Sequence, residues 1–225
     1  MRGNPCRGPL IAGTSHRASI VNIMLHWLKR HPFLTGFVLL YTAVFGGIAL
    51  SQGNDEFVFY TVAMVLYIGG VLWLDSRIHL STLAFWLLAI WGLLHMAGGV
   101  VPIPESWMDG QKPVLYALRV AEWMPRYDQV VHTFGFFAGT VAASEALRAG
   151  IRMRLSVGLA IGCALMGMGL GAVNEIVEFV AVLVMPETGV GGYINTGWDL
   201  VCNGIGAVCG AVLSWWRFGR TRPGA

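Results

Sequence analysis

The chain has 225 residues, of which 56% are hydrophobic and 12% are charged, and its formal net charge is +3. An ordinary soluble domain has about 25% charged residues, so this chain has too few to cover a water-facing surface of its size. The high apolar content excludes intrinsic disorder, and the lack of a basic stripe interleaved with aromatic residues argues against nucleic-acid binding. We therefore expect a membrane protein with the lipid bilayer as its partner.

Residues 1–32 are predicted to be a cytoplasmic, flexible tail, because they lack the continuous apolar core of a signal peptide. Met24 is an alternative start of the chain, which leaves open whether residues 1–23 belong to the native protein. A single membrane domain is expected over residues 33–216, and a second short cytoplasmic tail over residues 217–225.

Six apolar segments follow one another, and each approaches the roughly 20 residues that a helix needs to cross about 30 Å of hydrocarbon. The segments are continuous rather than alternating, which indicates helices and not barrel strands. The expected fold is an all-α, polytopic membrane bundle of six transmembrane helices. The predicted spans are residues 33–51, 57–74, 80–101, 128–147, 155–185 and 197–216.

The basic residues predict the orientation of the bundle. With the N-terminus inside, twelve of the fifteen Lys and Arg residues fall in inner segments, and only Lys112, Arg119 and Arg126 fall outside. Cytoplasmic loops carry an excess of Lys and Arg, so both termini are expected in the cytoplasm.

Two kinds of connecting segment are expected at the ends of the spans. Residues 113–125 carry apolar side chains at helical spacing between two prolines, which is consistent with a surface helix, a plain connector or a lid. Charged residues in the short turns are expected to be solvated. In particular, Glu145 should form an exposed ion pair with Arg148, and Asp75 and Glu56 should lie in exposed turns.

Polar residues of the last four spans fall at one depth, the outer half of the membrane. A charge in a span costs about 2.5–3.5 kcal/mol on insertion scales, so these positions point to a purpose. The residues are His95 in the third span, Asp128 and His132 in the fourth, Asn174, Glu175 and Glu178 in the fifth, and Asp199 and Asn203 in the sixth.

Helical spacing places these polar residues on glycine-rich faces. His132 shares a face with Gly135 and Gly139, and Glu175 continues a face that contains Gly171. Small residues mark contacts between membrane helices, so the polar side chains are expected to point into the bundle.

Histidine and carboxylate ligands together suit Zn, Mn, Fe or Ni, and helix bundles assemble such sites from several helices. The predicted divalent-metal ligands are His95, His132, Glu175, Glu178 and Asp199. The predicted catalytic residues are His132 and Glu175, with Asp128 orienting His132.

Each residue also has a structural alternative. Asp128 and Asp199 could be helix N-caps, His95 a packing histidine, and Asn203 a hydrogen-bonding link between helices.

Four motifs carry a family resemblance that covers most of residues 33–215. They are L-H-M-A-G-G at 94–99, Y-D-Q-V-V-H at 127–132, N-E-I-V-E-F at 174–179 and W-D-L-V-C-N-G-I-G-A at 198–207. Their order resembles the YjdF-like bacterial inner-membrane proteins, a family with a domain of unknown function, and is more weakly similar to the VanZ-like group associated with glycopeptide tolerance. The resemblance implies a six-helix membrane fold and no established activity.

Three functions agree with the sequence. The first is a membrane enzyme or binding protein for an envelope lipid, with a divalent metal in a periplasmic pocket. The second is a structural or partner-binding subunit whose polar cluster links helices. The third is a proton-coupled transporter, which the apolar inner halves of the spans disfavour.

The orientation can be tested with reporter fusions. Fusions after Arg154 and at the C-terminus should report the cytoplasm, and fusions near Glu187 should report the periplasm, because of the excess of inner basic residues. A periplasmic C-terminus would contradict the predicted topology.

Overall fold

The structure is a computed structural model in which residues 27–185 and 188–219 are described. This part of the chain is all-α and contains six helices that are long and apolar enough to cross a membrane, which confirms the predicted fold class. No strand is present in the described part, apart from two isolated bridges in a loop. The helices are α2 (Pro32–Ser51), α3 (Asp55–Ile78), α4 (Thr82–Val100), α5 (Tyr127–Ile151), α6 (Val157–Val184) and α7 (Tyr193–Phe218).

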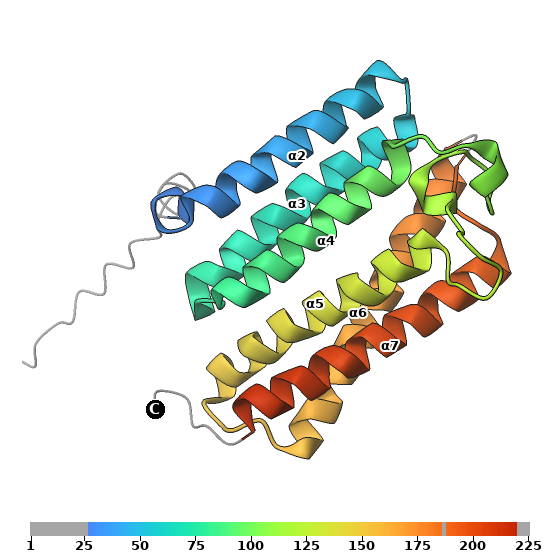
Figure 1. Cartoon of the computed structure of the whole chain (residues 1–225). Coiled ribbons are helices and arrows are strands. Elements are labelled where there is room, and N and C mark those ends of the chain that lie inside the picture. Colours follow the sequence, from blue (N-terminus) through green and yellow to red (C-terminus); the bar gives the residue numbers. More distant parts are fainter. Residues whose placement is uncertain (1–26, 186–187, 220–225) are drawn as a thin grey trace, which may run out of the picture.

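The helices form two groups of three, α2–α4 and α5–α7, and run roughly parallel or antiparallel to one another (Figure 1). Helix α5 joins the groups, because it packs against α4 as well as against α6 and α7. Helices α4 and α6 end, and α5 and α7 begin, at the same end of the bundle, here called the pocket end. The opposite end is called the basic end.

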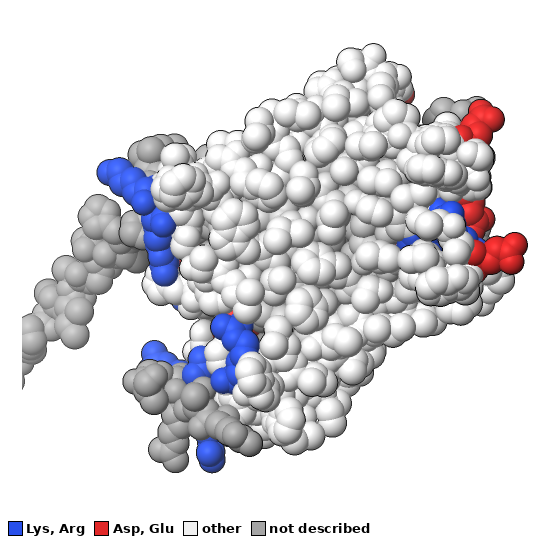
Figure 2. Space-filling view, in the orientation of Figure 1, with Lys and Arg blue, Asp and Glu red and all other residues white. Residues whose placement is uncertain are grey.

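Charged side chains gather at the two ends of the bundle and leave its middle uncharged (Figure 2). Lys and Arg dominate the basic end, whereas Asp and Glu, with a few basic residues, lie at the pocket end. The middle presents large apolar side chains to the surroundings, such as Leu66 of α3 and Leu165 and Phe179 of α6. A surface of this kind is suited to lipid, and the charge asymmetry has the pattern from which the orientation was predicted.

Glycines of α7 bring this helix into backbone contact with α5. A Cβ atom on Gly206 of α7 would lie 2.0 Å from the carbonyl oxygen of Thr133 in α5. A Cβ on Gly210 would lie 2.6 Å from the Phe137 carbonyl oxygen, one turn further along. Because no side chain fits at these positions, the polar residues on the same faces are held within a few ångströms of one another.

The expectation of solvated charges near the basic end was wrong. Glu145 accepts hydrogen bonds from the backbone and the hydroxyl of Ser81, at 2.7 and 2.6 Å, and pairs with Arg217 at 3.4 Å. Arg148, its expected partner, lies instead over the ring of Phe218. Glu145 therefore ties the N-terminus of α4 to α5 and α7.

Asp75 is also buried rather than exposed. It accepts hydrogen bonds from the indole of Trp27, at 3.1 Å, and from the backbone of Leu80, at 2.8 Å. Trp27 is itself buried and packs edge-on against Phe85 of α4, so the chain just before α2 is fixed to the bundle. Sequence spacing places these residues in turns but gives no information about the neighbouring helix that covers them.

The loop before α5 is not a surface helix. It contains only 3-10 turns at Glu105–Trp107 and Leu115–Ala117, and it folds back on itself through bridges between Pro102 and Val114 and between Met108 and Leu118. Prolines and these cross-loop hydrogen bonds compete with a regular helix. The loop lies over the pocket end of the bundle (Figure 1).

Glu56, expected in an exposed turn, is buried and anchors this loop. Its carboxylate pairs with the ammonium of Lys112 at 3.0 Å and accepts a hydrogen bond from the backbone of Gly189 at 2.8 Å. One carboxylate of α3 therefore holds both the α4–α5 loop and the α6–α7 connection at the pocket end.

The glycine contacts give a stability prediction. Gly206→Ala should lower the thermal unfolding temperature in detergent, because the added Cβ must push α7 away from Thr133. Gly204→Ala is the matched control, since its Cβ would meet only a flexible methionine tip, of Met168, at 3.8 Å. Equal melting temperatures for the two variants would contradict the close packing of α5 and α7.

Candidate functional site

Apart from His95 of α4, the predicted site residues lie in the first two turns of α5 and α7 and in the second half of α6. Asp128 is the second residue of α5, whose N-cap is Arg126. Asp199 is the seventh residue of α7, which begins at Tyr193, four residues earlier than predicted. Neither aspartate is therefore an N-cap, and the capping alternative is wrong for both.

His132 of α5 lies at the centre of the cluster and is buried, with 7% of its surface exposed. Its Nδ1 atom lies 3.0 Å from Oδ1 of Asn203 in α7, and Nδ2 of Asn203 donates to Glu175 of α6 at 3.0 Å. Because the Asn203 amide nitrogen donates to the carboxylate, its oxygen can accept a hydrogen bond from Nδ1 of His132. Asn203 thus links three helices, as its structural alternative had it, and with Nδ1 protonated the neutral imidazole has its lone pair on Nε2.

Two carboxylates from different helices face this lone pair. Nε2 of His132 lies 3.4 Å from Oδ1 of Asp128 and 3.6 Å from Oε1 of Glu178. Charge-assisted N–H···O bonds are about 2.7–2.9 Å long, so both separations are long for hydrogen bonds. They are close to the roughly 3.3–3.4 Å that separates two ligands of one tetrahedral ion at about 2.0–2.1 Å.

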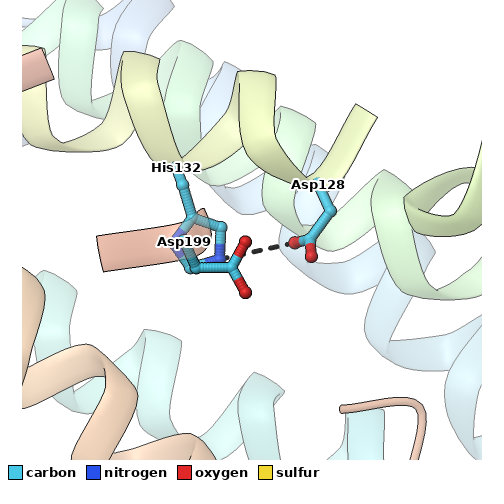
Figure 3. Close-up of side chains that lie close together, drawn as sticks. All are labelled: Asp128, His132 and Asp199. Atoms are coloured by element: carbon cyan, nitrogen blue, oxygen red, sulfur yellow. Dashed lines mark ion pairs between the residues drawn. The ribbon is translucent and has the colours of Figure 1, made fainter. Parts of the chain in front are cut away.

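The structure forms two groups of potential metal ligands, and His132 belongs to both. The first contains Asp128, His132 and Asp199 (Figure 3), and the second contains His132, Glu175 and Glu178. In each group one ligand atom per residue lies within 4.8 Å of the others. Three equally spaced atoms bound to one ion at about 2.1 Å are at most about 3.6 Å apart, so a contraction of roughly 1.2 Å or less would complete either site.

Two buried carboxylate oxygens of the cluster have no hydrogen-bond partner among the described residues. They are Oδ1 of Asp199, a residue with no exposed surface, and Oε2 of Glu175. The other oxygen of Asp199 accepts from Asn195 at 2.6 Å. A buried charge without a partner is costly, and a proton or a cation beside it removes that cost.

His95 lies outside both ligand groups in the described structure. It forms part of the wall of a cavity of about 60 Å³ at the pocket end, which Asp128 and Glu178 also line. Its ring stacks on Trp91, and its Nδ1 atom is hydrogen-bonded to the hydroxyl of Tyr116 in the loop.

Tyr116 is uncharged in that hydrogen bond. Burial, and after it the negative charges of Asp128 and Glu178, raises the pKa of the Tyr116 hydroxyl well above its usual value, so the hydroxyl keeps its proton. Such a hydroxyl can bond to Nδ1 of a neutral His95, and the histidine tautomer decides which of the two groups donates.

Several contributors were missed at the level of sequence. Asn195 supports Asp199, and its spacing of four residues within a helix was the available signal. Asn174 donates to Glu178 of its own helix at 2.7 Å. Lys112 and Tyr116 come from an irregular loop, where no periodicity indicates which side chains reach the site.

Comparison with protein families identifies the relationship that the four motifs suggested. The family described as "Predicted membrane protein (DUF2238)" matches residues 33–220, essentially the whole membrane part of the chain. The chain belongs to this family, which includes the YjdF proteins and has no established function. The weaker similarity to the VanZ-like group stays a prediction. No curated protein and no solved structure matches the chain.

Proposed function

We propose that this protein is a multi-pass protein of the bacterial inner membrane that holds a divalent cation in a periplasmic pocket and uses it to bind, or act on, the head group of an envelope lipid. Nε2 of His132 and the carboxylates of Asp128 and Asp199 would be the main ligands, and Glu178 faces the same nitrogen. A cation at this position would polarise an oxygen atom of the head group.

The observation that carries this proposal is the spacing around Nε2 of His132. Carboxylates on two helices lie too far from this nitrogen for strong hydrogen bonds and at the separation expected of ligands that share an ion. The unpartnered oxygen of Asp199 supports the same conclusion, because no described residue donates a hydrogen bond to it.

Glu175 has a different position from these ligands. It lies on the Nδ1 side of His132, at 3.5 Å, and it accepts a hydrogen bond from Asn203. We assign it the role of a proton-holding group beside the ion, which it can perform through its unpartnered Oε2 atom.

A purely structural role is the alternative, and the Asn203 network favours it. This residue bonds to His132 of α5 and to Glu175 of α6, which is what an interhelical link requires. A transporter has less support, because the interior is tightly packed beyond the cluster. A Cβ on Gly167 would lie 1.9 Å from the hydroxyl of Thr140, a contact that leaves no room for a passage between α5 and α6.

Replacing one predicted metal ligand distinguishes a cation site from a purely structural link between helices. Purified Asp199→Asn protein should lose its bound divalent metal, because Asn keeps the shape of the side chain and removes the charge. A chelator should lower the melting temperature of wild type and leave that of Asp199→Asn unchanged. The reason is that a bound ion at a concentration of 100 times its Kd stabilises the folded state by about 2.7 kcal/mol. The measurements are metal content by mass spectrometry and thermal unfolding in detergent.

Asp109→Asn is the matched control. Asp109 is about half exposed and pairs with Arg119 in the loop, so this variant should retain metal and respond to chelator as wild type does. Metal-free wild-type protein that is insensitive to chelator would leave the structural link as the function of the cluster.

A further inference from the structure

The ligand of the pocket-end cavity can be characterised from the charges of its walls. The cavity is lined by three carboxylates, of Glu56, Asp128 and Glu178, and by two cationic side chains, of Lys112 and Arg126. The two cations come from the loop and from the residue before α5, whereas the carboxylates belong to α3, α5 and α6. The carboxylates are here called the acidic floor of the cavity, and Lys112 and Arg126 its basic rim.

Neither basic residue is satisfied by one ideal partner. Lys112 pairs with Glu56 at 3.0 Å, and an ammonium has three donors. Arg126 lies 3.8 Å from Asp128 and donates from its other terminal nitrogen to the carbonyl of Asp109 at 3.2 Å. Arg119, the third basic residue of this loop, does not line the cavity and pairs with the exposed carboxylate of Asp109 at 2.9 Å.

The sign of the net charge around the cavity depends on whether the cation is bound. Three carboxylates and two basic groups, with His95 neutral, leave a net charge of −1, which disfavours an anion. A divalent ion on Asp128 changes this to +1 and places positive charge on the floor as well as on the rim. An anion can then be held from two sides.

The wall also contains an unused hydroxyl group. Tyr60 of α3 lines the cavity with only 8% of its surface exposed, and its hydroxyl has no hydrogen-bond partner among the described residues. A buried hydroxyl without a partner favours a ligand that brings an acceptor. A tetrahedral oxyanion brings several acceptors in different directions, more than a carboxylate does.

We infer that the cavity binds a phosphate group, bridged between the divalent ion on the acidic floor and the basic rim of Lys112 and Arg126. This inference rests on the proposed function, because the phosphate follows the cation. The cavity has Phe57 and Val190 in its wall beside the charged groups, so the wall offers apolar contacts to a phosphate carried on an apolar chain. Inorganic phosphate has the same chemistry, and the test distinguishes the two sources.

The test uses the full chain in phosphatidylcholine nanodiscs, loaded with Mn²⁺ and desalted. Bound Mn²⁺ should broaden the ³¹P resonance of dodecyl phosphate. If the apolar chain contributes to binding, the ³¹P resonance of inorganic phosphate should be broadened less. Lys112→Gln should retain Mn²⁺ and weaken phosphate binding at least about tenfold, the effect of losing one hydrogen bond to a charged group. Arg119→Gln is the control and should bind as wild type does.

Arg126→Gln is a second variant, because Lys112→Gln also leaves the buried Glu56 without its ion pair. Retained Mn²⁺ without broadening of either phosphate would overturn this inference and leave the proposed cation site intact. A wild-type protein that retains no Mn²⁺ would overturn both. Unchanged phosphate affinity in both rim variants would also contradict the inference, and a preference for inorganic phosphate would assign a soluble source.

Discussion

Negative charge gathered around one buried imidazole is the constraint on which this molecule depends. Four carboxylates, from Asp128, Glu175, Glu178 and Asp199, approach His132 inside a bundle whose middle is apolar. Carboxylates this close repel one another, and removing them from water is costly, so the folded state needs protons or a cation among them. Asn203 can satisfy only one carboxylate oxygen and one imidazole nitrogen. In the proposed function, a bound cation compensates the remaining negative charge.

The helix packing serves this arrangement. Glycines at 206 and 210 let α7 contact the backbone of α5, and Gly171 admits the side chain of Asn203, whose Cβ lies 2.9 Å from the position of an added Cβ. These contacts bring polar residues of three helices to one depth. At the same end, Glu56 fastens two connecting segments over the cavity, so the site is enclosed by the bundle and its loops together.

The spans and the convergence of polar residues could be predicted, because hydropathy and helical spacing are local properties of the sequence. Asp128, His132 and Asp199 lie close together because the glycine-rich faces that carry them pack against each other. The errors came from contacts between distant segments. Glu145 and Asp75 were expected in solvent. Instead, Ser81 at the N-cap of α4 bonds to Glu145, and Trp27 bonds to Asp75. The contributions of the loop depend on irregular backbone, for which periodicity gives no signal.

The most direct test of this account is anomalous X-ray diffraction from crystals of the full chain grown with Mn²⁺. The account predicts an anomalous peak about 2.1 Å from Nε2 of His132, with carboxylate oxygens of Asp128 and Asp199 in its coordination sphere. Crystals that show no peak in the cluster at saturating Mn²⁺, with Nε2 of His132 bonded directly to a carboxylate, would contradict it.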